Sequence, residues 1–186
     1  MWTERTAFLR TWLQRPLEVG SVLPSSPRLA RRIASLVDWD RTRTLVELGA
    51  GTGAVTAGLL ARASASTRLL AFERQPEFRQ ILQDRFAGLE VYPEARQLSR
   101  VLESAGPRQA ETVVSGIPFA LLSRPEQEAL LDEIDRGLAP GGSFIAFQYS
   151  PFLLPSLRRR FEKVSLHLVL ANLPPALIYC CRKGEQ

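Results

Sequence analysis

The stretch LVELGAGTGAVT, residues 45–56, places three glycines between an apolar run and a segment with helical character. The apolar run predicts a buried strand, and residues 54–62 predict the helix that follows it. Gly49, Gly51 and Gly53 then occupy the turn, where glycine permits positive φ angles and lets a ligand approach the backbone. In a parallel αβ sheet this turn lies at the carboxyl end of the strand, beside the first N–H groups of the helix. A dinucleotide and a smaller adenosine-containing ligand fit such a turn equally well.

Beyond this turn, short β-rich runs alternate with helical stretches. This alternation predicts an α/β fold in which helices cover both faces of a parallel sheet. The last two extended runs have no helix between them, so we expect a hairpin whose last strand lies antiparallel in the sheet. The expected strands are residues 44–48, 68–72, 89–92, 111–117, 143–149, 163–171 and 176–182, and the expected helices are residues 54–62, 76–86, 96–104 and 124–138.

Composition indicates one soluble domain with an anionic partner. The chain has 186 residues, 45% of them hydrophobic, and a net charge of +5, which favours acidic lipid, nucleic acid or a phosphorylated substrate. Residues 1–43 hold eight arginines against four acidic residues, so we expect the anionic partner to bind there. The adjacent Cys180 and Cys181 indicate a reducing compartment. No apolar run reaches the roughly 20 residues that span a bilayer and no signal peptide is recognisable, so we expect a cytoplasmic protein.

The second expected strand ends in Phe-Glu-Arg, which places Glu73 twenty residues after Gly53. A carboxylate at this position can accept hydrogen bonds from both hydroxyls of a ribose. The loop has G-x-G-x-G spacing with Glu47 two residues before its first glycine, whereas a dinucleotide loop usually needs G-x-G-x-x-G. The motif Glu-Leu-Gly-Ala-Gly-Thr-Gly, together with Glu73, resembles the cofactor site of class I S-adenosylmethionine-dependent methyltransferases. The resemblance covers residues 45–149.

This resemblance implies a single Rossmann-like domain that binds S-adenosyl-L-methionine and releases S-adenosyl-L-homocysteine. In that family an acidic residue after the third strand, often within Gly-Asp-Ala, meets the adenine amino group; here the stretch is Pro-Glu-Ala and departs from the pattern. The end of the fourth strand, Ser-Gly-Ile-Pro-Phe, would lie under the methyl group, although a strand that simply ends in a turn has the same pattern. The implied cofactor residues are Glu47, Gly49, Ala50, Gly51, Thr52, Gly53, Glu73, Arg74, Glu94, Ala95, Ser115 and Gly116.

The first fifteen residues have an amphipathic helical pattern. Trp2, Phe8 and Trp12 share one face of a helical wheel, with arginines around them. A helix that lies in a lipid interface has this pattern, and so does a helix that packs on its own domain. We therefore divide the chain into residues 1–43, an amphipathic helix with a segment that covers cofactor and substrate, and residues 44–186, one S-adenosylmethionine-binding domain.

The stretch EVGSVLPSSPRLARRIA, residues 18–34, bears on the methyl acceptor. Together with FLRTWLQRP, VVSGIPF, FQYSPF and NLPPA, it resembles bacterial phospholipid N-methyltransferases, which methylate phosphatidylethanolamine stepwise to phosphatidylcholine. The matches run from residue 8 to residue 179. The resemblance implies peripheral attachment to anionic phospholipid at the inner face of the cell membrane. Ser21, Ser25 and Ser26 would close over the cofactor and the lipid phosphate, or else form a helix-entry turn with a serine cap.

Methyl transfer to an amine is a direct displacement at a sulfonium methyl, so the protein must align the reactants and exclude water but needs no metal ion. A protonated amine must first lose its proton. Tyr149, after the fifth expected strand, and Ser115, at the end of the fourth, are the candidate catalytic residues. Glu47 is a third possible helper, or it orients loop N–H groups or the amino group of the cofactor. We expect a monomer.

Two other functions remain open. An RNA adenine N6-dimethyltransferase shares the glycine loop and a basic surface, but it has an Asn-Leu-Pro-Tyr-like loop where this chain has Ser-Gly-Ile-Pro followed by Phe119. Such enzymes usually continue into a helical RNA-binding domain, whereas this chain ends at Gln186, so we expect no nucleic acid partner. The second is a non-catalytic module that binds the cofactor and a membrane. Among lipid acceptors, ornithine lipid or another amine also stays open.

Overall fold

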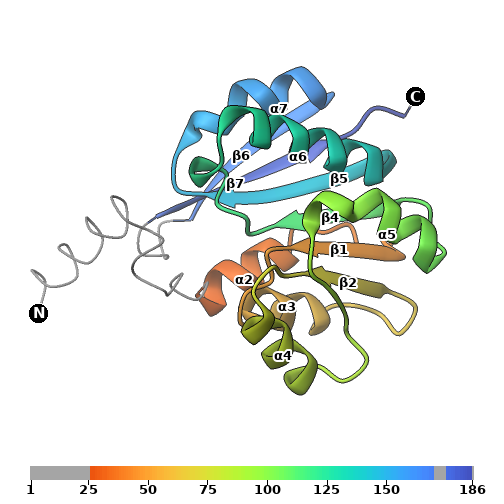
Figure 1. Ribbon diagram of the computed structural model, residues 1–186. Helices are drawn as coiled ribbons and strands as arrows, with labels where there is room; N and C mark the ends of the chain where they lie inside the picture. The colour runs from red at the N-terminus through yellow and green to blue at the C-terminus, as the bar shows by residue number, and fades with distance from the viewer. Residues whose placement is uncertain (1–25, 170–174, 186) are drawn as a thin grey trace, which may run out of the picture.

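A computed structural model describes residues 26–169 and 175–185. These residues form a seven-stranded sheet of order β3-β2-β1-β4-β5-β7-β6 (Figure 1). The strands are β1 (Thr44–Leu48), β2 (Arg68–Phe72), β3 (Glu90–Tyr92), β4 (Ala110–Ser115), β5 (Leu138–Gln148), β6 (Lys163–Val169) and β7 (Ala176–Arg182). The helices are α2 (Pro27–Ala34), α3 (Ala54–Leu60), α4 (Pro76–Arg85), α5 (Leu98–Ala105), α6 (Arg124–Gly137) and α7 (Leu154–Arg160), with the short 3₁₀ turns η1 (Ala95–Gln97), η2 (Phe119–Leu121) and η3 (Pro151–Leu153).

The sheet is parallel from β3 to β5 and antiparallel beyond. The strands β1 to β5 pair in parallel, whereas β7 pairs antiparallel with both β5 and β6. Because β7 runs opposite to both neighbours, β6 runs in the same direction as β5. The expected parallel sheet with an antiparallel C-terminal hairpin strand is therefore confirmed.

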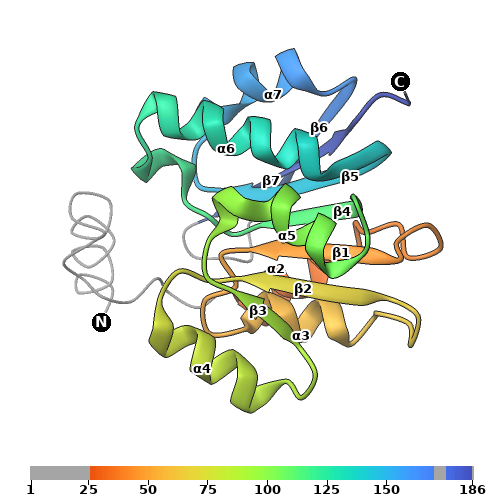
Figure 2. The same ribbon diagram turned by 45° about the vertical axis from the view of Figure 1, so that its right-hand side comes forward.

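Helices cover both faces of the sheet (Figures 1 and 2). On one face, α5, α6 and α7 pack on a cluster that includes the fully buried Phe72 and Phe144. On the other face, α2 and α3 pack on Leu45, Val114 and Ile145. Nearly continuous apolar runs such as Thr44–Leu48 are what a strand buried on both faces requires.

The helix α2 belongs to this packed domain. It begins at a serine cap, since the Ser26 hydroxyl accepts a hydrogen bond from the Leu29 N–H at 3.2 Å. Leu29 and Ile33 are fully buried, and each contributes about 1.5–3 kcal/mol through burial. Gly58 of α3 allows α2 to approach closely, because a Cβ there would lie 3.1 Å from the Cβ of Ala30.

The structure corrects three of the expected boundaries. β5 begins at Leu138, not at residue 143, so the Ala-Pro-Gly-Gly segment lies in the strand, and the β4–β5 register shifts between Ala110 and Thr112. Only Leu138 in this early part of β5 pairs with β4, and residues 139–142 bulge out before the pairing resumes at Ser143. The Gly141 N–H donates to the Gly184 carbonyl at 3.0 Å, and the Lys183 N–H donates to the Gly142 carbonyl at 2.9 Å, so residues after β7 hold the bulge. The expected helix 96–104 starts with η1 and becomes α-helical at Leu98. The expected strand 111–117 ends at Ser115.

Candidate active site

The carboxyl ends of three neighbouring strands lie level with one another. Leu48 of β1 pairs with Phe72 of β2 and with Ser115 of β4. The next residues continue this pairing: the Gly49 N–H donates to the Phe72 carbonyl at 2.7 Å, and the Gly116 N–H donates to the Leu48 carbonyl at 2.8 Å. The glycine loop and the end of β4, which are far apart in the sequence, therefore meet at one edge of the sheet, here called the carboxyl edge.

The three loop glycines have different roles. Gly49, Gly51 and Gly53 all have positive φ, at 74°, 55° and 85°. A Cβ on Gly49 would lie 3.1 Å from the backbone nitrogen of Ile117, and a Cβ on Gly53 would lie 2.5 Å from the ring of Phe86. A Cβ on Gly51 would meet no atom within 4 Å. The outer two glycines therefore permit close packing, whereas Gly51 faces open space that a ligand can use.

Glu73 connects the glycine loop to the end of β2. Its side chain is buried, one carboxylate oxygen accepts the Gly51 N–H at 2.8 Å, and the other accepts the Gln75 N–H at 2.9 Å. Gln75 is the residue before α4. This carboxylate therefore shapes both loops of the carboxyl edge, in addition to the ribose contact that the sequence predicts.

Glu47 lies beneath the start of α3. Its carboxylate accepts a hydrogen bond from the Thr56 hydroxyl at 2.6 Å, and its side chain is almost fully buried. Burial raises the pKa of Glu47 to about 8, although hydrogen bonds from Thr56 oppose the change. The carboxyl group thus holds the first turns of α3 against β1, directly after the glycine loop.

A second contact from α4 supports the loop, and sequence reasoning missed it. The Arg85 guanidinium donates to the Thr52 carbonyl and lies 5.1 Å from the centre of the Phe86 ring, which packs against Gly53. Arg85 is 33 residues from Thr52 and ends a helix with ordinary surface composition. No local pattern reveals such a contact, because it depends on how α4 packs against the sheet.

The residues expected near adenine and ribose follow β3 and β2. The Glu73 N–H donates to the Tyr92 carbonyl at 2.9 Å, so β3 also ends at the carboxyl edge. The Glu94 side chain accepts the Arg96 N–H at 3.3 Å and caps η1, whose first residue is Ala95. Arg74 is exposed on the loop that follows Glu73.

The two candidate catalytic residues end adjacent strands. Ser115 is fully buried, and its hydroxyl accepts the Ile117 N–H at 3.3 Å. The Gln148 side chain donates to the Ile117 carbonyl at 2.9 Å and so ties the end of β5 to the loop after β4. Tyr149 follows Gln148 and packs, partly buried, against the core on the α2 side of the sheet. Both residues therefore lie at the carboxyl edge.

Comparisons with known proteins match this arrangement. A family model described as a methyltransferase domain matches residues 45–142. The chain is 34% identical over 180 residues to the ornithine lipid N-methyltransferase of Singulisphaera acidiphila, and the match covers 94% of each protein. The chain belongs to the S-adenosylmethionine-dependent methyltransferases.

Solved structures share the fold of this methyltransferase. The N-methyltransferase NodS from Bradyrhizobium japonicum WM9 matches with a TM-score of 0.70 and 15% identity, over 85% of this chain and 96% of NodS. NodS in complex with S-adenosyl-L-homocysteine matches with a TM-score of 0.66 and 15% identity, over 85% of this chain and 88% of that one. An O-methyltransferase family protein from Burkholderia thailandensis matches with a TM-score of 0.64 and 14% identity, over 98% of this chain and 60% of that one. These likenesses confirm the expected Rossmann-like fold.

The carboxyl edge of the methyltransferase fits S-adenosyl-L-methionine, its methyl donor. Gly51 leaves open space beside the backbone, where an adenosine can approach. Each oxygen of Glu73 accepts one backbone hydrogen bond, and a carboxylate has about four acceptor positions, so one position on each oxygen remains for a ribose hydroxyl. The chemistry of these two residues therefore fits the adenosine part of the cofactor.

Several residues named from the sequence fall outside the described part of the methyltransferase. These are Trp2, Phe8, Trp12, Ser21 and Ser25. Ser26 is described, and its hydroxyl caps α2, as the helix-entry interpretation predicts. Within residues 26–169 and 175–185, none of the helices has the length and apolar character that crossing a bilayer requires.

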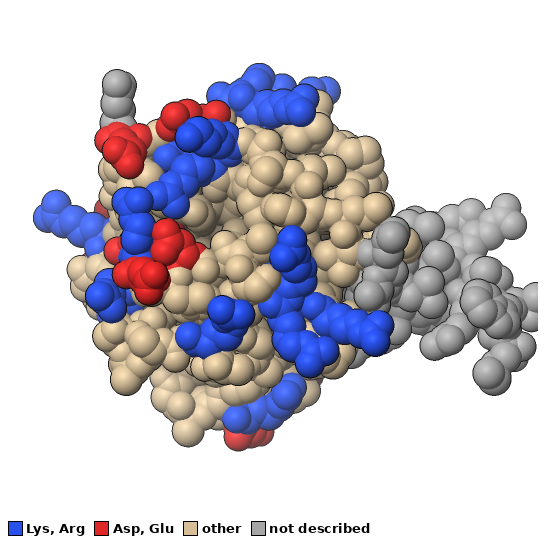
Figure 3. All heavy atoms as spheres, turned by 180° about the vertical axis from the view of Figure 1, so that it is seen from behind, with Lys and Arg blue, Asp and Glu red and all other residues tan. Residues whose placement is uncertain are grey.

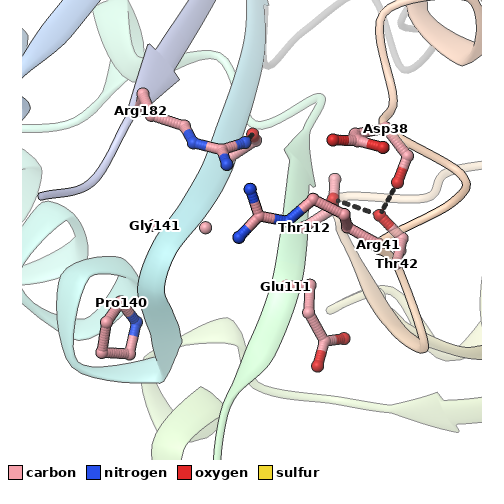
Figure 4. A pocket seen from close by; sticks show the side chains of 10 residues that line it. Asp38, Arg41, Thr42, Glu111, Thr112, Pro140, Gly141 and Arg182 are labelled. Carbon is pink, nitrogen blue, oxygen red and sulfur yellow. Dashed lines mark hydrogen bonds between the residues drawn. The ribbon is translucent and has the colours of Figure 1, made fainter. Parts of the chain in front are cut away.

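The opposite edge of the sheet contains a small hollow of about 30 Å³ (Figure 4). Figure 4 shows the side chains of Arg41 and Arg182 reaching toward the same space. Asp38 and Glu111 also line the hollow, so its charges are mixed. The Glu111 carboxylate accepts the Thr44 N–H at 2.7 Å and supports the start of β1. The hollow therefore lies far from the cofactor loop, and its residue Glu111 has a structural role at the start of β1.

Proposed function

We propose that the methyltransferase transfers a methyl group to the amine of a membrane lipid head group. The observation that carries this proposal is the match with an ornithine lipid N-methyltransferase, at 34% identity over 94% of both chains. The resemblance of the chain to phospholipid N-methyltransferases supports the same class of acceptor. A lipid amine is a small nucleophile, and the reaction requires only that its lone pair meet the methyl group in line.

The bound cofactor would supply an electrophilic methyl group on a sulfonium sulfur. The neutral amine nitrogen would take this methyl group as the carbon–sulfur bond breaks with its electron pair on sulfur, which would give S-adenosyl-L-homocysteine as the product. We assign Gly51 and Glu73 to cofactor binding and the loop from Ser115 to Ile117 to the floor of the acceptor site. Gln148 holds this floor by its hydrogen bond to Ile117. These residues position the reactants and keep water away.

The lipid amine must lose a proton before it reacts. We assign this step to Tyr149, with Ser115 as an alternative, because both lie at the ends of the strands that flank the acceptor site. The burial of Ser115 favours Tyr149. Tyr149→Phe should lower kcat at least about tenfold with little change in cofactor affinity, in line with the usual contribution of general base catalysis. An unchanged pH–rate profile in this variant would remove the assignment.

For the head group we propose phosphatidylethanolamine, methylated in successive steps to phosphatidylcholine, with ornithine lipid as the second candidate. The relative favours ornithine lipid, whereas the motifs favour phosphatidylethanolamine. The two acceptors are distinguished by incubating the protein and labelled S-adenosyl-L-methionine with vesicles that contain one lipid or the other. Most of the transferred label should enter phosphatidylethanolamine and appear in its mono-, di- and trimethylated products.

Control vesicles and added RNA distinguish the proposed function from its alternatives. Vesicles of phosphatidylcholine and phosphatidylglycerol should take up no label, because neither has a free amine. Label that enters ornithine lipid alone would correct the head group but keep the lipid acceptor. Label in added RNA, or in nothing at all while the cofactor still binds, would support the dimethyltransferase or the non-catalytic module and contradict the proposal.

We further propose that the enzyme acts as a monomer at the inner face of the membrane and that residues 1–15 contribute to attachment. Their amphipathic pattern supports this role. Deleting them should lower sedimentation with anionic vesicles at least about tenfold while leaving cofactor affinity within about twofold, since one interfacial helix supplies apolar and electrostatic attraction. Wild-type sedimentation of the shortened chain would contradict this role.

A further inference from the structure

Large exposed apolar side chains gather around the carboxyl edge. Leu121 lies in η2, directly after β4, and Phe152 lies in η3, directly after β5. Leu166 and Leu168 lie on the edge strand β6, whose carboxyl end reaches the same edge as that of β5. Leu168 is 59% exposed and Leu121 is 48% exposed. We call these four side chains the apolar rim.

The rim lies on one side of the sheet. Its sequence neighbours Phe119, Leu153 and Val164 pack into the core beneath α5, α6 and α7. Leu166 and Leu168 follow Val164 in steps of two, so they share its face of β6. In the described residues only two other large hydrophobic side chains are exposed, and these are Leu60 at the end of α3 and Ile81 on α4. The distribution of exposed apolar surface is therefore uneven, and it follows the edge that holds the cofactor loop.

The other side of this edge is basic. The helix α2 exposes Arg28, Arg31 and Arg32, while its buried side packs in one cluster with residues at the ends of β6 and β7. Arg32 also approaches His167 of β6 at 3.4 Å. Within the described part of the chain, none of these arginines pairs with a carboxylate. Figure 3 shows one group of Lys and Arg side chains near the middle of the face in view with no Asp or Glu beside it, whereas other Lys and Arg side chains at the left and bottom of the view lie next to acidic ones. We call the three arginines the basic helix face.

We propose that the carboxyl edge docks on an anionic bilayer, with the apolar rim inserted among the lipids and the basic helix face against anionic head groups. Apolar side chains beside arginines suit a lipid interface, which offers both an acyl boundary and negative charge. This proposal rests on the proposed function, because a lipid amine can reach the cofactor when this edge faces the bilayer. The two features lie at the same edge of the sheet as the cofactor loop, so docking would bring the head group to that edge.

The apolar rim is tested with the full chain and vesicles of equal parts phosphatidylglycerol and phosphatidylcholine. The double variant Phe152→Glu/Leu168→Glu should bind these vesicles about 30-fold more weakly than wild type, since two apolar side chains would no longer insert. The matched control is Leu60→Glu/Ile81→Glu, which adds the same charge at side chains that are 37% and 36% exposed but lie outside the rim. The control should bind within about threefold of wild type, because charge alone changes the affinity little at those sites.

The basic helix face is tested with Arg28→Gln/Arg31→Gln/Arg32→Gln. Its affinity for the anionic vesicles should fall about 100-fold, because each arginine near an anionic surface contributes about 1 kcal/mol of binding free energy. Its binding to pure phosphatidylcholine vesicles should stay unchanged, because these vesicles have no net negative charge to attract the arginines. The control replaces Arg62, Arg100 and Arg108 with glutamine; these arginines are also exposed. A control that loses as much affinity as the α2 variant would show an effect of net charge only and would overturn the assignment of this face.

The remaining outcomes are equally decisive. Wild-type vesicle binding by Phe152→Glu/Leu168→Glu would overturn the docking surface. A changed melting temperature or oligomeric state with unchanged vesicle binding would show that this chain, or a second copy, covers the rim, and it would also overturn the proposal. Vesicle binding requires no turnover, so it is measured separately from methyl transfer. A docking surface that holds while no lipid is methylated would refute the proposed function alone.

Discussion

Glu73 and Glu111 make the same kind of contact at opposite edges of the sheet. Glu73 accepts the N–H groups of Gly51 and Gln75 at the carboxyl edge, and Glu111 accepts those of Arg43 and Thr44 at the other edge. Around Glu111 the neighbouring groups are satisfied within the protein, as in the hydrogen bond between the Thr42 and Thr112 hydroxyls at 2.9 Å. Around Glu73 the loop leaves Gly51 facing open space. The same interaction therefore stabilises the fold at one edge and prepares a binding site at the other.

The largest effect should come from the packed glycine of the loop. Gly53→Ala combines a positive φ with a Cβ 2.5 Å from the Phe86 ring, and it should lower the free energy of unfolding by about 3–4 kcal/mol. Gly51→Ala meets no neighbour, so it should cost about 1 kcal/mol of stability but weaken cofactor binding about tenfold. Chemical denaturation and calorimetry measure the two quantities. Equal losses of stability in the two variants would contradict the division of roles between these glycines.

Next in size is the loss of the Glu73 carboxylate. Glu73→Ala should weaken S-adenosyl-L-methionine binding about 100-fold, because hydrogen bonds to a charged group contribute about 1.5–3 kcal/mol each. Titration calorimetry measures the affinity. Glu77→Ala is the matched control, since Glu77 is an exposed acidic residue in the first turn of α4, and it should bind the cofactor like wild type. Unchanged affinity in Glu73→Ala would refute the ribose assignment.

A smaller effect depends on pH and comes from Glu47. Its folded-state pKa of about 8 lies above the ordinary value of 4.5, so the folded protein holds this proton more tightly than the unfolded chain does. The contribution to stability is complete below pH 4.5 and is lost as pH rises through 8. Glu47→Gln should remove roughly 2 kcal/mol of the decline between pH 5 and pH 8, as seen in denaturant titrations at both pH values. If the free energy of unfolding changes with pH in the same way in the variant and the wild type, the raised pKa of Glu47 does not contribute to this decline.

The smallest change should come from Glu111. Glu111→Ala leaves the Arg43 and Thr44 N–H groups without their acceptor and should cost about 1–2 kcal/mol of stability. Cofactor affinity should stay within about twofold of wild type, since the contact lies at the edge opposite the glycine loop. Thermal unfolding and calorimetry check the two values. A large loss of affinity would mean that the two edges are coupled.

Much of the fold could be predicted from local sequence patterns. The alternation of apolar runs and helices predicted the parallel sheet, and the absence of a helix after residue 163 predicted the antiparallel strand β7. The glycine loop and Glu73 were identified because their spacing follows directly from a strand, a tight turn and the next strand. These features depend on residues that are close in sequence or on adjacent strands.

The rest depends on contacts between distant segments. The separate roles of Gly51 and Gly53 follow from where the Phe86 ring lies, and no pattern in the loop encodes that. The early start of β5 depends on contacts with distant segments, because Leu138 pairs with Ala110 and the glycines of the bulge hydrogen-bond with residues after β7. The proline and glycines themselves locally disfavour a strand. The exposure of Leu168 is equally unpredictable, since an alternating strand has the same pattern whether a helix covers it or not.

The position of β6 also has a consequence for the stability of the apolar rim. β6 hydrogen-bonds only with β7 in the described sheet, and β7 follows it in the chain. β6 is therefore connected to the rest of the sheet only through β7. The place of β6 in the sheet therefore depends entirely on the pairing of β7 with β5. Because Leu166 and Leu168 lie on β6, a change that weakens the β5–β7 pairing would also displace half of the surface proposed to meet the bilayer.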